Sequence, residues 1–318
     1  MVSIRLGRLL NLPRILAICV TVFFLFGCGA KPKMNDNLKN FQFICTQEKD
    51  RFPPLDSEAD MRFKEARHLE KQKGKKDYVK IGSLYRQASM KNHYKAMGNL
   101  QALLAQGKVT PSQGQFRQQE VIDIVERLIK MDIPFGYFIM GTYLQQGYGV
   151  EQDSEAAFKY MLKAAVMGNP DGQYVIGQRF MDATNPQSYR LDLGRSMLAC
   201  SAEQGYAKSA YTLGIDYDID KNYSTALYYY QKAAEYGYQK STYKLSKVFN
   251  TDAPKNELDY LGQQIDPERV KRYQKIHDEL DKNPYAKFPD INKIVPLPPA
   301  ELPEWDGTFE YKKQAEGQ

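Results

Sequence analysis

Side chains that commonly bind metal ions or transfer protons are few in this sequence. The three histidines, His68, His93 and His277, fall on predicted helices or at their edges, and none has a second histidine at ligand spacing. A structural zinc ion needs four protein ligands, and a catalytic zinc ion needs three. We therefore predict no metal site.

Motifs for covalent catalysis and for nucleotide binding are also absent from the sequence. No Gly-x-Ser-x-Gly turn is present to hold a nucleophilic serine, and no glycine-rich phosphate loop or dinucleotide fingerprint occurs. Gly147-Tyr-Gly149 indicates a loop and nothing more. We expect no catalytic residue, no cofactor and no enzymatic activity.

One acidic cluster, Asp216, Asp218 and Asp220, is spaced like the first ligands of a calcium-binding loop. Such a loop has glycine at its sixth position and a bidentate glutamate at its twelfth. Lys221 and Leu227 occupy these positions, so we interpret the cluster as a solvated helix end.

Residues 1–27 are organised like an export signal. Basic residues, and no acidic ones, precede the apolar run Ile15–Phe26, which is too short to span a bilayer of about 30 Å as a helix. The basic residues are Arg5, Arg8 and Arg14.

The sequence Leu25-Phe26-Gly27-Cys28 resembles the lipobox of bacterial lipoproteins, with a bulkier residue at Phe26 than is usual. The resemblance implies that Cys28 becomes the N-terminus and carries acyl chains such as palmitate, which hold the protein on a membrane. Gly29 replaces the aspartate that retains lipoproteins in the inner membrane. An outer-membrane lipoprotein facing the periplasm is therefore implied, and the alternative is an ordinary signal peptide or anchor.

Cysteine usage follows from this interpretation. Cys19 would leave with the signal and Cys28 would carry lipid, so only Cys45 and Cys200 remain in the body. An oxidising periplasm would allow these two to pair. Cys200 also falls where a buried helical residue is expected, so the sequence leaves a disulfide and two free thiols both open.

Composition sets the class of protein. The chain has 318 residues, is 42% hydrophobic and 26% charged, and has a mean hydropathy of −0.58. These values exclude a mainly disordered chain and a polytopic membrane protein. Without the three signal arginines, 41 basic residues face 38 acidic ones, a net charge of +3. Because the basic and acidic residues are so nearly equal in number, the charge indicates no nucleic-acid partner.

The body of the sequence contains a repeated block. Each copy begins with a small residue and carries a large apolar residue four positions later, and successive copies end 40, 36, 37 and 32 residues apart. The blocks are Ala96–Gln101, Gly136–Gly141, Gly172–Gly177, Ser209–Gly214 and Ser241–Ser246. A second repeated sequence pattern follows each block at a similar distance. It occurs in Ala157–Ala165, Ala226–Ala234 and, more weakly, Gly194–Ala202.

These spacings predict pairs of helices. Apolar residues at i, i+3 and i+4 give each repeated segment one buried helix face, and small residues allow two helices to approach closely. Gly168, Gly205 and Gly237 stand where a helix ends in the left-handed conformation, and Pro170 would open the next helix. Because one pair cannot cover its own apolar face, we predict an all-α fold, an α/α solenoid. At helical spacing, one or two of Tyr228–Tyr230 must face the core.

The unit running from Gly141 through Gly147-Tyr-Gly149-Val150 to Asn169 resembles the Sel1-like repeat, a family of α/α solenoids related to tetratricopeptide repeats. The match is specific over 136–180, good over 206–240 and degenerate over 60–135. The resemblance implies about three clear repeats and two eroded ones.

Two flanking segments fit no repeat. The first comprises Phe43–Cys45 and Phe52–Asp60, and either Asp56 or Ser57 in it would cap the first helix. The second begins with an amphipathic helix at Asp266–Leu280 and ends in a Pro-rich tail. The expected organisation is 1–27 signal peptide, 28–55 tether and N-terminal segment, 56–135 degenerate repeats, 136–252 Sel1-like repeats and 253–318 C-terminal helix and tail.

The Pro-rich tail has two interpretations. Its prolines enforce an extended path, which suits an arm that enters a partner. We favour the alternative, in which Ile294–Trp305 lies back on the last helices and covers the open end of the solenoid. In either case we expect Trp305, the single tryptophan, to be buried.

Repeats and flanks together resemble Sel1-repeat lipoproteins that carry a domain of unknown function. Members of such groups occur beside type VI secretion phospholipase effectors, as their immunity proteins. The resemblance implies a periplasm-facing solenoid that binds and neutralises a phospholipase effector. Alternatives are a scaffold for resident envelope proteins and a periplasmic enzyme. Candidate contact residues are Gln145, Gln178, Arg179, Asp216 and Trp305.

Overall fold

The computed structural model describes residues 41–251 and 257–312. The chain separates into two units, residues 1–33 and 34–318, and every described residue belongs to the second. The predicted signal peptide and Cys28 lie outside the described residues. Within those residues there is no β-strand, and the helices are η2 (Glu48–Arg51), α1 (Ser57–Lys71), α2 (Tyr78–Met90), α3 (Tyr94–Ala105), α4 (Arg117–Lys130), α5 (Pro134–Gln146), α6 (Ser154–Val166), α7 (Pro170–Met181), α8 (Leu191–Glu203), α9 (Ala207–Ile219), α10 (Tyr223–Glu235), α11 (Gln239–Val248), α12 (Pro267–Lys282) and α13 (Ile291–Ile294).

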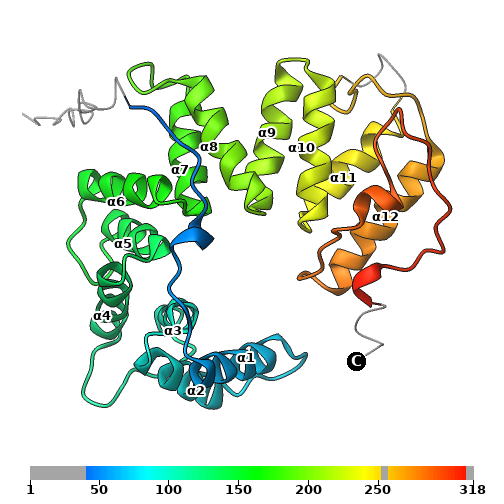
Figure 1. The fold of residues 1–318 in the computed structure, drawn as a ribbon. Helices are drawn as coiled ribbons and strands as arrows, with labels where there is room; N and C mark the ends of the chain where they lie inside the picture. The colour runs from blue at the N-terminus through cyan, green and yellow to red at the C-terminus, as the bar shows by residue number, and fades with distance from the viewer. Residues whose placement is uncertain (1–40, 252–256, 313–318) are drawn as a thin grey trace, which may run out of the picture. The chain divides into compact units, whose positions relative to one another are not determined.

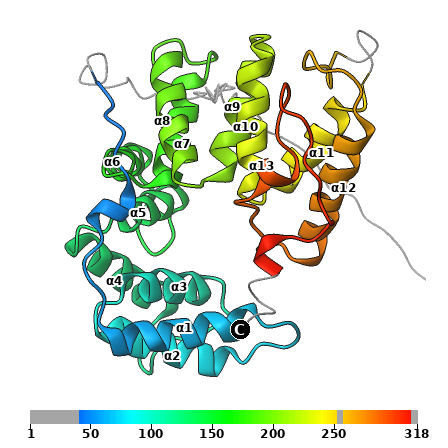
Figure 2. The ribbon, with the colours of Figure 1, turned by 45° about the vertical axis from the view of Figure 1, so that its right-hand side comes forward.

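Helices that are neighbours in the sequence are also neighbours in space. The closest pairs are α1 with α2, α5 with α6, α7 with α8, α9 with α10 and α11 with α12. Each pair then packs on the next, so the pairs follow one another in chain order in both ribbon views (Figure 1, Figure 2). The predicted α/α solenoid is confirmed.

The repeated blocks lie on α3, α5, α7, α9 and α11, and the last four of these are the first helices of the pairs named above. At Gly177 of α7, a Cβ atom would lie 2.3 Å from Leu198 Cδ1 and 3.0 Å from the Gly194 carbonyl oxygen of α8. The backbones therefore meet with no room for a side chain. This contact explains why a small residue recurs in the block.

Helix ends follow the sequence signals. Asp56, and not Ser57, is the N-cap of α1, because its carboxylate accepts a hydrogen bond from the Ala59 backbone at 2.9 Å. Three glycines adopt the left-handed conformation predicted for helix ends. They are Gly168, Gly205 and Gly237, with φ of +100°, +88° and +80°. Pro170 is the first residue of α7, as expected.

The C-terminal tail covers the last helices, as the favoured interpretation predicted. Ile294, Val295 and Phe309 are buried in one cluster with Tyr273 of α12 and Leu245 of α11. The cluster is held by hydrogen bonds: Gln231 donates to the Val295 carbonyl at 2.9 Å and accepts from the Tyr273 hydroxyl at 2.6 Å. The tail therefore caps the solenoid.

The tyrosine run in α10 divides between core and surface. Tyr230 is buried, with 1% of its surface exposed, whereas Tyr228 is 48% exposed. Tyr229 lies between these extremes and stacks on Tyr217 of α9 at 5.7 Å between ring centroids. Packing thus accounts for the run, as expected.

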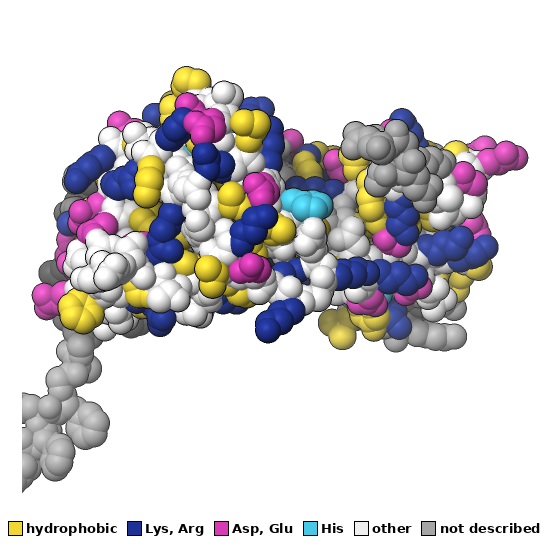
Figure 3. Space-filling view, turned by 90° about the horizontal axis from the view of Figure 1, so that it is seen from below, with side chains coloured by type: hydrophobic (Ala, Val, Ile, Leu, Met, Phe, Trp, Pro, Cys, Tyr) yellow, Lys and Arg dark blue, Asp and Glu magenta, His cyan; other side chains and the backbone are white. Residues whose placement is uncertain are grey.

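The surface mixes charges of both signs. Figure 3 shows one face on which Lys and Arg side chains are spread widely, with Asp and Glu side chains and scattered hydrophobic groups among them. In the described ranges, no helix combines the length and the apolar character that crossing a bilayer requires.

Candidate protein-binding site

A groove of about 590 Å³ runs between α6 and α7, beside the end of α5. Its lining contains both apolar and polar side chains. The apolar ones come from one side of α6 and the facing side of α7, and they are Ala157, Phe158, Met161, Val175 and Ile176. The groove is open to solvent and offers an apolar floor to a ligand.

The polar edge of the groove contains three of the residues singled out from the sequence. Gln145, Gln178 and Arg179 line it together, from the ends of α5 and α7. The Arg179 guanidinium lies over the Phe158 ring, 4.6 Å from its centroid. An apolar centre with a polar edge, containing an aromatic ring and an arginine, is typical of protein interfaces.

The groove also carries a negative charge. Asp182 follows α7 and lines the same edge. Hydrogen bonds from Thr184, together with the nearby Arg179, lower the pKa of the Asp182 carboxyl below its ordinary value. The edge therefore presents a guanidinium, a carboxylate and two amides, which suits the polar groups of a protein.

Asp216 lies elsewhere, in a network of ion pairs. Its carboxylate accepts from Arg195 Nε of α8 at 2.6 Å, and Arg195 also pairs with Asp220. Asp218 pairs with Lys244 of α11 at 3.3 Å. The prediction of a solvated helix end holds for the exposed Asp220, the C-cap of α9, and was wrong for Asp216 and Asp218, which are half-buried and tie α9 to its neighbours. Asp216 is not part of the groove.

Trp305 also lies away from the groove, in the C-terminal cap. The prediction that it would be buried was wrong, because the side chain is only half-buried. Its indole Nε1 donates to the Thr308 carbonyl at 2.8 Å, and Lys275 Nζ lies 5.1 Å from its ring centroid. The ring packs on Phe309. These contacts account for Trp305 within the fold.

A set of aromatic residues was not recognised from the sequence. The third place of four successive blocks holds an aromatic ring, and three of these rings are half-buried while the fourth is exposed. Tyr206 and Tyr238, which precede the next first helices, pack against two of them at 5.4 and 4.9 Å between centroids. The recurrence was visible in the aligned blocks. The four rings are Phe138, Tyr174, Tyr211 and Tyr243.

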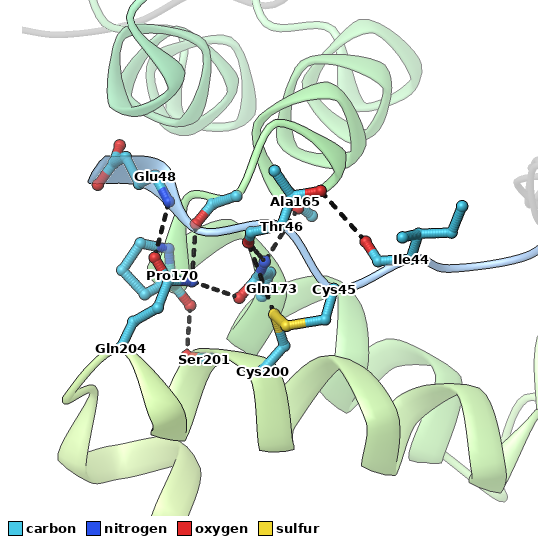
Figure 4. The surroundings of a disulfide bond; sticks show 11 residues. Ile44, Cys45, Thr46, Glu48, Ala165, Pro170, Gln173, Cys200, Ser201 and Gln204 are labelled. Carbon is cyan, nitrogen blue, oxygen red and sulfur yellow. Dashed lines mark hydrogen bonds between the residues drawn. A yellow bond between two sulfur atoms is a disulfide. The ribbon is translucent and has the colours of Figure 1, made fainter. Parts of the chain in front are cut away.

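Residues 41–51, here called the N-terminal strap, cross α7 and α8 (Figure 4). Cys45 of the strap forms a disulfide with Cys200 of α8, with 5.6 Å between the Cα atoms. The pairing joins segments separated by 155 residues. Of the two possibilities that the sequence left open, a disulfide and two free thiols, the structure shows the disulfide.

Hydrogen bonds fix the strap on both sides of the disulfide. Gln173 of α7 donates to the Thr46 carbonyl at 3.0 Å, and Gln204 accepts from the Glu48 backbone at 2.8 Å. Gln204 also donates to the Gly168 carbonyl at 2.8 Å (Figure 4). At its beginning, the Phe41 carbonyl accepts from Arg190 at 2.7 Å.

The strap and the groove share one hydrophobic cluster. Phe41 and Phe43 of the strap pack against a core that includes Met161 and Ile176, and these two residues also line the groove. The Phe41 ring is stacked on Phe180 with 6.2 Å between centroids. The strap therefore supports the groove floor from within the fold.

Glu48 is a partly buried carboxyl in the strap. It accepts hydrogen bonds from the Asn169 side chain at 3.0 Å and from the Phe135 backbone at the start of α5. Burial outweighs these bonds, and the nearby Asp171 adds to its effect, so the pKa of Glu48 rises from an ordinary 4.5 to about 7. The folded state therefore favours the protonated form.

Replacing Glu48 with glutamine should make folding less sensitive to pH. Because the folded pKa of about 7 exceeds the ordinary 4.5, the stability that the protonated group contributes is full below pH 4.5 and is lost as the pH rises through about 7. Glu48→Gln should raise the free energy of unfolding by about 1–3 kcal/mol near pH 8 and change it little near pH 4. Urea unfolding at both pH values measures this.

Glu151→Gln, at an exposed position outside the strap, is the matched control and should show no such difference between the two pH values. If Glu48→Gln changes the stability equally at both pH values, folding does not raise the pKa of Glu48 and the assignment is wrong.

No group of three or more His, Cys, Asp or Glu side chains converges as a metal site within the residues that the structure describes.

Two family models match parts of the chain. The Sel1 repeat model matches residues 134–169 and 200–238, and a domain of unknown function (DUF6396) matches residues 241–318. No curated protein sequence matches the chain. A Sel1 repeat protein from Oxalobacter formigenes has 20% sequence identity and a TM-score of 0.53 over 70% of this chain and 87% of its own, which shows a common fold.

Solved structures from Pseudomonas aeruginosa are more similar. Immunity protein PA5088 has 30% identity and a TM-score of 0.67, with 81% of this chain and 94% of that chain covered. Immunity protein Pa5087 has 30% identity and a TM-score of 0.65, with 81% and 95% covered. Identity at this level over most of both chains indicates common descent, so the chain belongs to the family of Sel1-repeat proteins that includes these Pseudomonas immunity proteins.

Proposed function

We propose that this protein is an immunity protein: a lipid-anchored, periplasm-facing solenoid that binds and neutralises a phospholipase effector delivered by type VI secretion. The observation that carries the proposal is the 30% identity to Pa5087 and PA5088, both described as immunity proteins, over 81% of this chain. Neutralisation by binding requires a complementary surface and no chemistry of its own.

The α6–α7 groove supplies a suitable surface. Its apolar floor would exclude water from an effector side chain, and Arg179, Gln178 and Asp182 would fix the polar groups around it. Arginine and aromatic residues contribute most of the binding energy at many interfaces. We therefore propose that Phe158 and Arg179 form the centre of the effector contact, and that occlusion of the effector keeps it inactive.

Membrane attachment through Cys28, which is part of the proposal, would serve the same function. A phospholipase attacks the bilayer, so an inhibitor held at the outer membrane meets the effector where it acts. Two or more acyl chains on one residue would make such attachment stable. The test is mass spectrometry of the mature protein, which should begin at an acylated Cys28.

A contact-killing assay tests the immunity function. A strain from which the gene is deleted should lose viability beside a sister strain that secretes the phospholipase, and the wild-type gene should restore survival. Restoration by a gene encoding Phe158→Ala with Arg179→Glu should be weak, since losing two central contacts typically weakens binding by about 100-fold. Binding of the purified proteins to the effector measures this directly.

Lys130→Glu on α4 is the matched charge reversal, because Lys130 is exposed and lies outside the groove. It should protect as well as the wild type. Survival of the deletion strain beside the armed strain would refute the immunity function. Full protection by the groove variant would refute only the assignment of the groove.

A further inference from the structure

Two loops from opposite ends of the described chain are rich in lysine. The end of α1 and the loop after it contain Lys71, Lys73, Lys75 and Lys76, and residues 71–76 include no acidic side chain. The end of α12 and the loop after it contain Lys282 and Lys287, and residues 282–289 include no acidic side chain either. All of these lysines are exposed except Lys76, which is half-exposed.

The two loops are neighbours in space. Lys71 Nζ lies 5.7 Å from the centroid of the Tyr285 ring, which belongs to the loop after α12. Tyr285 is 65% exposed, although it is a large aromatic residue. The lysines of both loops and Tyr285 are called here the basic loop surface.

Three carboxylates beside this surface are engaged within the fold. Glu70 accepts hydrogen bonds from Arg67 and from the Tyr85 hydroxyl, and Asp77 caps the N-terminus of α2. Asp281 accepts from Gln239. Within the residues that the structure describes, Lys73, Lys75, Lys76 and Lys287 form no ion pair with a carboxylate, so their charges remain available to a ligand. Lys282 lies near Glu279 and helps to lower the pKa of that carboxyl.

We propose that the basic loop surface binds the anionic headgroups of a phospholipid bilayer. Clustered lysines on exposed loops attract an anionic membrane surface without a shaped cavity. An exposed tyrosine beside them suits the headgroup layer, because its ring is apolar and its hydroxyl is polar. The balanced charge of the rest of the chain argues against a nucleic acid, which would need a longer basic track.

This contact would be separate from a lipid on Cys28 and from the α6–α7 groove. An anchor fixes one point of a protein near a membrane and leaves its orientation free. A second contact through the basic loop surface would present a defined face to the bilayer. The proposal needs no effector and no anchor, so its failure leaves the immunity function untouched.

Vesicle sedimentation tests the proposal. The probe is the second compact unit, residues 34–318, with its disulfide intact and without the preceding segment. It should bind vesicles of equimolar phosphatidylcholine and phosphatidylglycerol and should not bind vesicles of phosphatidylcholine alone. Binding should fall away as salt is raised to about 1 M, where the screening length is about 3 Å.

The triple substitution Lys73→Gln, Lys75→Gln and Lys76→Gln should weaken vesicle binding by about 100-fold, since each lysine near an anionic surface strengthens binding about fivefold. A triple at exposed lysines elsewhere, Lys130→Gln, Lys163→Gln and Lys208→Gln, removes the same charge and is the control. Thermal unfolding should show that both variants are folded. Equal binding to both kinds of vesicle, or equal weakening by the two triples, would overturn the proposal.

Discussion

Replacing Gly168 with alanine should lower the free energy of unfolding by about 2–5 kcal/mol, the sum of a backbone and a packing cost. Gly168 has φ of +100°, a conformation that disfavours a side chain. A Cβ atom there would also lie 2.6 Å from the Gln47 carbonyl carbon and 2.7 Å from the Glu48 nitrogen. Since both neighbours are backbone atoms, the strap itself would have to move. Urea unfolding of the oxidised protein measures the loss.

Gly205→Ala is the matched control, because Gly205 holds the same place one repeat later. Its φ is +88°, but the nearest atom to an added Cβ is Tyr236 Cε1 at 3.5 Å, an ordinary contact. This variant should therefore lose only about 1–2 kcal/mol, from the backbone alone. If both variants lose the same amount, the strap does not press on Gly168 in solution and the larger estimate is wrong.

The helix pairs were predictable because their signals are local. Small residues at Gly141 and Gly177 recur with the period of a hairpin, and each hairpin packs mainly on its neighbours. Left-handed glycines and the proline after Gly168 mark the boundaries. In a repeat architecture, near neighbours in sequence supply most of the contacts, so periodicity alone fixes the order of packing.

The strap was not predictable for the opposite reason. Its contacts join residues more than a hundred positions apart, such as Thr46 with Gln173 and Cys45 with Cys200. The strap has no periodicity. Counting cysteines left Cys200 as the one available partner of Cys45, but nothing in the sequence showed that the two meet. The raised pKa of Glu48 depends on the same distant contacts, so the sequence contained no sign of it.

The candidate site was predictable in part. Gln145, Gln178 and Arg179 meet in one groove because they occupy related places on the first helices of adjacent repeats. Asp216 occupies a comparable place but faces Arg195 of the preceding helix, which binds it. The position of a residue within its repeat thus indicates which face of the solenoid it lies on. Whether its polar side chain is free to bind a partner depends on which residue of the neighbouring helix it contacts.

Removing the disulfide should have a comparably large effect. In the variant Cys45→Ser with Cys200→Ala, the free energy of unfolding should fall by about 2–5 kcal/mol, because the bond closes a loop of 155 residues and a cross-link over so long a loop restricts the unfolded chain strongly. Urea unfolding of oxidised samples measures the loss. A reductant should destabilise the wild type by a similar amount and leave the variant unchanged, which separates the bond from side effects of the substitutions.

The disulfide should also affect partner binding, because the strap that it holds packs on the cluster beneath the groove. Phe41 and Phe43 contact that cluster, while Met161 and Ile176 belong both to it and to the groove floor. Loosening the strap should therefore weaken effector binding under conditions in which the protein stays folded. If reduction lowers stability but leaves the affinity unchanged, the strap stabilises the repeats without shaping the groove. If reduction changes neither, Cys45 and Cys200 are not paired in the protein.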